Sequence, residues 1–302
     1  MDYLCRSLCV AIACLVGLAG AVPCSYAGET LYKTGFEPPT FVPGPLVGQD
    51  GWTAPPPISP LSSNAAVIST DKPHQGQQSV LVPGTDLVPS ADQGQAPGES
   101  INELTNGYYD AIGSYRKPVC VDLAKPGCTS VGDFTGYDTR GTQTVRVSAH
   151  VRVDGRRTGP KNNFFSASLG AVALGFDNGE DTPEGVGELA ISSDGQVHAY
   201  SGADLVPTFL TSAHVTLGEW HNLAVEANCA TRETSFFVDD ECLGSFPFDP
   251  RVTTDLLLRG SMLTYAAPDT ATTHKADYAA HFDQFSIKVV EPEECEVKGA
   301  DR

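Results

Sequence analysis

Three basic side chains alternate along one segment of the chain, residues 142–153, with the sequence TQTVRVSAHVRV. In an extended strand Arg146, His150 and Arg152 share one face, and an unbroken set of small apolar residues takes the other. A polysaccharide lyase needs an arginine to neutralise a uronate and a histidine or tyrosine to move a proton. Polar residues are equally the ordinary occupants of the solvent face of such a strand. The segment therefore predicts a half-buried antiparallel strand whose open face binds a ligand or faces water.

Carboxylate pairs for glycoside hydrolysis are harder to find. Such an enzyme needs two Asp or Glu side chains about 5–10 Å apart across a cleft. The strand pattern Glu-x-Asp-x-x-Glu does not occur in the chain. The acidic runs FDNGEDTPEGVGE at 176–188 and VDDE at 238–241 fall on a predicted loop and a predicted turn, where acids are usually solvated. Gly-x-Ser-x-Gly, phosphate-loop, Rossmann and zincin motifs are absent too, so we assign no catalytic residue.

The net charge and the N-terminal residues indicate which partners are disfavoured and in which compartment the protein works. Its 302 residues carry a net charge of −18, which disfavours nucleic acid and anionic lipid as partners. Residues 1–27 hold an apolar run, LCVAIACLVGLAGAV, followed by Ser-Tyr-Ala, which predicts a signal peptide and a mature start at Gly28. The run is shorter than the ~20 residues of a membrane-spanning helix. We expect an exported protein, extracellular or periplasmic, with no membrane span after cleavage.

Five cysteines remain after that cleavage: Cys120, Cys128, Cys229, Cys242 and Cys295. An odd number leaves at least one without an intramolecular partner. Cys120 and Cys128 flank a Lys-Pro-Gly turn signal, so we predict a local disulfide between them. A hairpin would place Cys229 and Cys242 toward opposite ends of its middle strand, too far apart to bond to each other. The pairing of Cys229, Cys242 and Cys295 stays open.

Many short strands separated by turns predict the fold. The strongest further candidates are 79–82, 164–176, 187–192, 196–200, 208–216, 220–227, 234–238, 243–248, 254–259 and 278–290, the last divided after His281. No segment has sustained helical periodicity. The sequence predicts one two-sheet antiparallel jelly-roll β-sandwich over residues 28–291, with long loops, and a charged, disordered tail at 292–302.

Four segments in order resemble the concanavalin A-like, laminin-G-like jelly rolls of secreted bacterial proteins. They are GFE with GQDGW at 35–52, KPHQGQQSVLV at 72–82, LGEWHNLAVEANCATRETSFFVDDECLGSF at 217–246 and HFDQFSIKV at 281–289. The match departs from the usual pattern at Asp240, where a turn glycine is expected, and at Gln284, where Asn is expected. This fold carries lectins, glycosidases, lyases and spacers alike, so the resemblance implies a fold and leaves the function open.

The resemblance also implies a structural calcium site. Its ligands would be Glu37, the carbonyl of Gln75 or His74, and Asp283, with Asp71 as an extra ligand. Calcium accepts such mixed carboxylate and carbonyl oxygens. The alternative is that Glu37 and Asp283 are unrelated surface acids.

We predict different roles for the two tryptophans. In the resembling pattern Trp220 opens a strand as a core anchor. Of the two, Trp52, beside a glycine-rich loop and PPP, is the better candidate for an exposed ring that stacks on a sugar, but core packing is the role we favour for it. We therefore expect a non-catalytic module that binds a glycan or a cell-surface polymer through Trp52, Arg146, His150 and Arg152. A glycoside hydrolase or lyase and a structural envelope protein are the alternatives.

Overall fold

The computed structural model of the chain describes residue 28 and a series of segments that together hold the strands. These are residues 30–52, 66–83, 114–119, 144–155, 170–177, 184–192, 194–201, 207–248, 257–263, 278–292 and 295. The predicted leader and the cysteine pair Cys120 and Cys128 lie outside the described residues.

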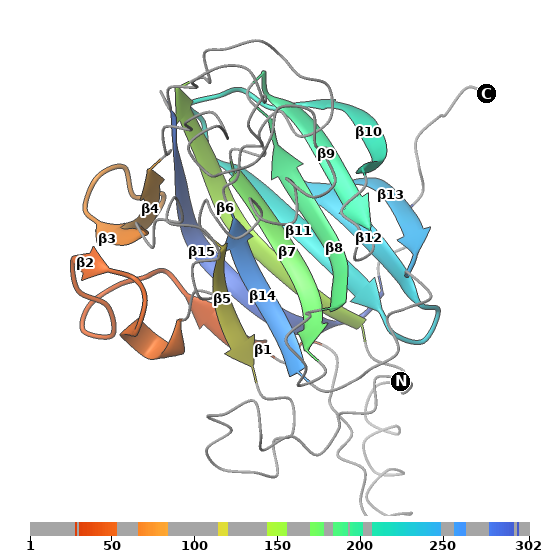
Figure 1. Cartoon of the computed structure of the whole chain (residues 1–302), viewed down its shortest axis with the longest axis horizontal. Coiled ribbons are helices and arrows are strands. Elements are labelled where there is room, and N and C mark those ends of the chain that lie inside the picture. Colours follow the sequence, from red (N-terminus) through yellow and green to blue (C-terminus); the bar gives the residue numbers. More distant parts are fainter. Residues whose placement is uncertain are drawn as a thin grey trace, which may run out of the picture.

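Two antiparallel sheets lie face to face (Figure 1). The larger, sheet A, has the order β13-β12-β11-β6-β15-β4-β3-β2, and β1 also pairs with β15. Its strands are β1 (Thr30–Thr34), β2 (Gly44–Pro45), β3 (Val67–Ser69), β4 (Ser79–Pro83), β6 (Thr144–Gly155), β11 (His221–Asn228), β12 (Glu233–Val238), β13 (Glu241–Pro247) and β15 (Tyr278–Val290).

The smaller, sheet B, has six strands in the order β10-β9-β8-β7-β14-β5. They are β5 (Ser114–Val119), β7 (Gly170–Asp177), β8 (Glu184–Ile191), β9 (Gln196–Ser201), β10 (Pro207–His214) and β14 (Leu257–Leu263). A short 3₁₀ turn, η1 (Gln49–Gly51), lies outside both sheets. The predicted class, an all-β antiparallel jelly-roll sandwich, is confirmed.

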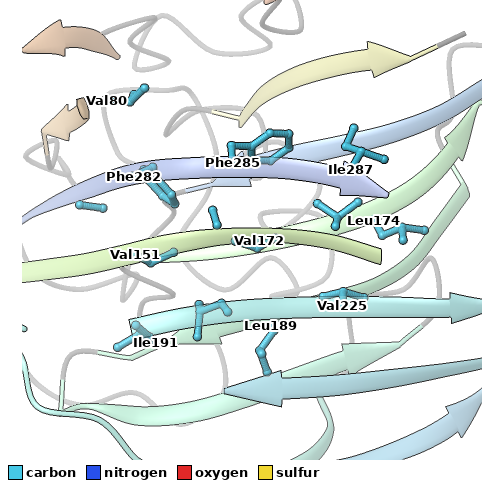
Figure 2. Packing of buried hydrophobic residues seen from close by; sticks show 14 of the residues in the cluster. Val80, Val151, Val172, Leu174, Leu189, Ile191, Val225, Phe282, Phe285 and Ile287 are labelled. Carbon is cyan, nitrogen blue, oxygen red and sulfur yellow. The ribbon is translucent and has the colours of Figure 1, made fainter. Parts of the chain in front are cut away.

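The core fills the space between the sheets, as Figure 2 shows for Val151, Val172, Leu189 and Phe282 among others. Strand β6 alternates buried and half-buried residues along its length, as its sequence predicts, and its valines enter the core. The two sheets approach each other closely at Gly170 on β7. A Cβ there would come 2.7 Å from Val151 Cγ1. The valine face of β6 therefore points at sheet B, and the face with Arg146, His150 and Arg152 points away from it.

Strand β15 is one continuous strand that pairs with two different neighbours on the same side. Its first residues pair with β4, and the segment from Phe285 to Lys288 pairs with β1. Strand β6 runs along its other side, with a bulge in register between Asp283 and Ser286. Gln284 in that bulge has a φ of 48°. The predicted division of 278–290 after His281 is therefore wrong, because an irregular register, rather than a turn, interrupts the pairing.

The C-terminal end of the described chain is fixed by a disulfide between Cys242 on β13 and Cys295. Cys229, just beyond β11, is a buried thiol. It lies at the opposite end of β12 from Cys242, as the hairpin prediction requires. Within the described residues, no helix has the length and apolar character needed to cross a membrane.

Candidate functional site

Glu37 and Asp283 hold one turn, residues 71–78 between β3 and β4, from two sides. Glu37 Oε1 accepts hydrogen bonds from the backbone N–H groups of Gln77 and Gln78, at 2.8 and 3.0 Å. Asp283 Oδ2 accepts from the N–H groups of His74 and Gln75, at 2.9 and 3.0 Å. We call Glu37 and Asp283 the carboxylate clamp. They meet on this turn because β1, which leads into Glu37, and β4, which follows the turn, both pair with β15.

Glycine is required at one point of this turn. Gly76 has a φ of 73°, and a Cβ on it would overlap the Glu37 carboxylate. Lys72 also has a positive φ, 51°. The hydroxyl of Ser79 donates to the carbonyl of Asp71 and joins the start of the turn to its end. The turn is thus fixed by side chains from two distant parts of the sequence and by the adjacent Ser79.

The calcium prediction stays a prediction. The structure brings Glu37 and Asp283 to the same turn as Gln75 and Asp71, which the prediction requires. The carboxylate oxygens, however, face amide N–H groups, and Asp71 contributes its backbone to the turn. Among the described residues, no group of three or more His, Cys, Asp or Glu side chains is placed to hold a metal. The donor set therefore fits an amide clamp better than a calcium ion, which takes six to eight oxygens.

Four rings from separate elements gather on the outer face of sheet A. His74, from the clamped turn, stacks on His150 of β6 with the ring centroids 4.1 Å apart and an interplanar angle of 17°. Trp220, from the segment before β11, lies 5.4 Å from His74 and 6.4 Å from His281 of β15. We call these four residues the ring cluster. Trp220 is half-buried, so part of the residue remains open to solvent.

Asp154 joins the ring cluster to the neighbouring cations. It accepts hydrogen bonds from Arg152 Nε and Nη2 and from Lys72 Nζ, at 2.9 to 3.1 Å. His281 Nε2 lies 3.3 Å from its Oδ2. Burial opposes ionisation of Asp154, but the hydrogen bonds from Arg152 and Lys72 outweigh it and leave its pKa below the ordinary value. Asp154 is therefore ionised and shared by three partners.

Arg146 lies on the same outer face of sheet A, before His150 on β6. Its guanidinium faces Glu226 of β11 at 3.9 Å and Asp240 at 3.8 Å. It also lies over the ring of Phe237, 4.4 Å from the ring centre. Asp239, in the same hairpin turn as Asp240, accepts a hydrogen bond from the N–H of Asn222 and lies 2.8 Å from His221 Nδ1.

The buried histidines of the cluster are held in the neutral form. Burial lowers the pKa of His150, and the neighbouring His74 lowers it further. Burial also lowers the pKa of His281, against the attraction of Asp154. The Nδ1 atoms of both rings are buried and have no hydrogen-bond partner among the described residues. Burial of both rings and, for His150, the nearby His74 favour uncharged imidazoles at neutral pH.

The structure places Trp52 in the core, the role favoured for it, and Trp220 outside the core, against its prediction. Trp52 is 0% exposed and packs against Tyr32, Phe36 and Phe285, so it offers no face to a sugar. Its place in the binding set is wrong, and core packing is what the structure has. Trp220 lies on the outer face instead of anchoring the core. The difference arises because η1 turns the chain back after Gly48 and carries Trp52 under β1.

Sequence reasoning placed Arg146, His150 and Arg152 on one face but missed the residues that come to meet them. His74, Trp220 and His281 arrive from a turn, a strand entry and a different strand. Two signals were present in the sequence. His74 lies inside the KPHQGQQS segment, and His281 stands two residues before Asp283, which contacts that segment. Only strand order, which brings β15 beside both β4 and β6, combines them.

Comparison with known proteins shows no family for the chain. No protein-family model matches the chain, and no curated protein matches it. Among solved structures it is similar to a lectin, UEA-II in complex with galactose, at 8% identity and a TM-score of 0.45, covering 88% of this chain and all of that one. It is also similar to an endo-β-1,4-glucuronan lyase from the fungus Trichoderma reesei, at 12% identity and a TM-score of 0.44, with 90% and 100% covered. A sialidase matches at 11% identity and a TM-score of 0.39; 75% of this chain covers only 16% of that one.

Proposed function

We propose that this protein is a carbohydrate-binding module and that the ring cluster on the outer face of sheet A is its binding site. The observation that carries the proposal is the half-buried ring of Trp220, packed between His74 and His281 on an open sheet face. An aromatic ring that is fixed on one side and open on the other suits stacking against the C–H face of a sugar. The half-buried side chains of His74, His150 and Arg152 supply donors and acceptors for hydroxyl groups.

The state of the arginines favours binding without catalysis. A lyase must use an arginine to neutralise the substrate carboxylate. Here Arg152 is already occupied by Asp154, and Arg146 faces Glu226 and Asp240. Lyase or hydrolase activity is the alternative function, supported by the placement of His150 between the two arginines on one strand face. A structural envelope protein is the second alternative.

Binding to a panel of soluble and insoluble polysaccharides, with product analysis in the same samples, tests the proposal. We expect retention on at least one polymer without release of reducing sugar or unsaturated product. Trp220→Ala should weaken retention by about five- to tenfold, given that stacking on one ring contributes on the order of 1–1.5 kcal/mol. Trp220→Phe should keep part of it, and Val42→Ala, an exposed residue elsewhere, should have no effect. Product release that Arg146→Ala abolishes would instead establish the enzyme.

We propose further that the protein is exported, with residues 1–27 removed. The support is the composition of that segment and the disulfide at Cys242 and Cys295, a bond typical of oxidising compartments. Mass measurement of the protein recovered from the culture medium or the periplasm should give a chain that starts at Gly28. Recovery of the full-length chain from the cytoplasm would contradict this.

Calcium remains a proposal for the carboxylate clamp. If it binds there, added calcium should raise the melting temperature by several degrees relative to chelator, and Glu37→Gln should remove that difference. Glu291→Gln, an exposed acid beyond β15, serves as the control. Equal melting temperatures with calcium and with chelator would leave Glu37 and Asp283 as ligands of the turn alone.

A further inference from the structure

The cations beside the ring cluster already have carboxylate partners within the chain. Arg152 and Lys72 both donate to Asp154. Arg146 faces Glu226 and Asp240 at distances just inside 4 Å. A carboxylate or sulfate group on a ligand would have to compete with these internal partners, which stand on the same rigid sheet. Such competition costs the ligand most of the energy that an ion pair would give.

Acids also outnumber cations around the cluster. The cations of this face and its adjoining turns include Lys33, Lys72, Arg146, Arg152 and Lys288, and the acids include Asp71, Asp154, Glu226, Glu233, Asp239, Asp240 and Asp283. Asp239 and Asp240 are well exposed, with 54% and 81% of their side chains open to solvent. The chain as a whole carries −18. An anionic polymer therefore meets a repulsive field at this face.

The histidines do not correct this imbalance. Burial lowers the pKa of both His150 and His281, so they are uncharged at neutral pH. The open part of Trp220 adds a surface for the apolar face of a sugar ring.

We infer that the ligand of the ring cluster is an uncharged glycan, made of sugars without carboxylate or sulfate groups, with one sugar ring lying on Trp220. This inference rests on the proposed function, because it names the class of carbohydrate for the same site. It separates the protein from binders of polyuronates, alginates and sulfated polymers. The exposed acids Asp239 and Asp240 act as the selective element, because they repel the charged members of each polymer class.

Affinity electrophoresis with matched polymer pairs tests the inference. The probes are dextran against dextran sulfate, hydroxyethylcellulose against carboxymethylcellulose, and neutral xylan, mannan and galactan against polygalacturonate and alginate. At low ionic strength we expect at least tenfold stronger retardation by a neutral polymer than by any charged one, and loss of that retardation in Trp220→Ala. Stronger retardation by a charged polymer that also depends on Trp220 would overturn the inference and leave the proposed function intact. Retardation by none of the polymers would overturn both.

A charge variant tests the cause of the selectivity. Asp240→Lys should increase retardation by a charged polymer at least threefold at low salt and change retardation by the neutral polymer less. Glu291→Lys, which makes the same change of net charge beyond the end of β15, should give a smaller effect. Equal effects of the two variants would show that overall charge, rather than the face around Trp220, sets the preference, and would count against the inference. The melting temperature of each variant checks that it is folded.

Discussion

Removing the negative charge from the carboxylate clamp should affect its two members unequally. Asp283 uses both of its oxygens: Oδ2 accepts from His74 and Gln75, and Oδ1 accepts from the N–H of Gln284 at 2.7 Å. In Asp283→Asn one of these positions becomes an NH₂ group that faces a backbone N–H, so at least one hydrogen bond is lost. Glu37 uses Oε1 alone for both of its bonds. In Glu37→Gln the amide oxygen can take that position and keep both.

The number of hydrogen bonds that each substitution loses gives the expected decrease in unfolding free energy. A hydrogen bond to a charged group contributes about 1.5–3 kcal/mol and a neutral one about 0.5–1.5 kcal/mol. Asp283→Asn loses one charged bond and weakens two more, but burial raises the pKa of Asp283, so removing its charge recovers part of the loss. We expect a net decrease in unfolding free energy of about 2–3 kcal/mol for Asp283→Asn and about 1 kcal/mol for the half-buried Glu37→Gln. At about 2–4 °C per kcal/mol, the melting temperature should fall by about 4–12 °C in the first and about 2–4 °C in the second.

Thermal melts and urea titrations of the purified variants measure these differences. Asp71→Asn is the matched control, because Asp71 is exposed and contributes its backbone N–H and carbonyl to the turn. It should change the free energy of unfolding by no more than about 0.5 kcal/mol. Equal losses in Asp283→Asn and Glu37→Gln, or a larger loss in Glu37→Gln, would refute the assignment of one accepting oxygen to Glu37 and two to Asp283.

Three further predictions concern the turns and the histidines. Gly76→Ala should lower stability by about 2 kcal/mol or more, since it combines a positive φ with overlap of Glu37; a urea midpoint equal to that of the parent would contradict this. Asp240→Gly should raise the melting temperature by up to a few degrees, because residues 239–240 form a two-residue hairpin turn with φ of 50° and 64°, where glycine is preferred. The free energy of unfolding should fall as the pH is lowered through about 6.5, the ordinary histidine value, because burial lowers the pKa of His150 and His281 and the folded state then binds fewer protons than the unfolded state. Replacing His281 by Gln should reduce the dependence of the unfolding free energy on pH. An unchanged dependence would contradict the role given to His281.

Local patterns predicted most of the strands. The alternation in 142–153 fixed the buried and open faces of β6, and the turns at Asp194-Gly195 and Asp239-Asp240 delimit strands close to their predicted bounds. Strands β3 and β5 are among those that the predicted ranges missed. VIS is too short to show a period, and SYRKPV contains a proline and two cations. Both form because a longer partner strand supplies the hydrogen bonds, β4 for β3 and β14 for β5.

Of the candidate site, only the residues on β6 could be predicted from the sequence, for a related reason. The residues of β6 could be assigned to a face because they follow one another at a period of two. The position of a tryptophan next to a loop carries no such periodicity. Trp52 and Trp220 both border polar turns, and the choice between core and surface depends on where each turn lies in the finished sandwich. Trp52 follows η1 into the space beside β1 and Phe285, while Trp220 follows a turn onto the outer face.

The carboxylate clamp connects the stability of the sandwich with the geometry of the candidate site. Asp283 accepts the N–H of His74 itself, so the same bond that fixes the turn also fixes the backbone of the residue whose ring stacks on His150. Glu37, at the far end of the turn, holds Gln77 and Gln78 and prevents the turn from lifting off β15. A ring attached to a turn held at both ends loses little entropy when a sugar binds beside it. Glu37 therefore contributes to binding through the position of His74, although its own carboxylate points into the turn and away from any ligand.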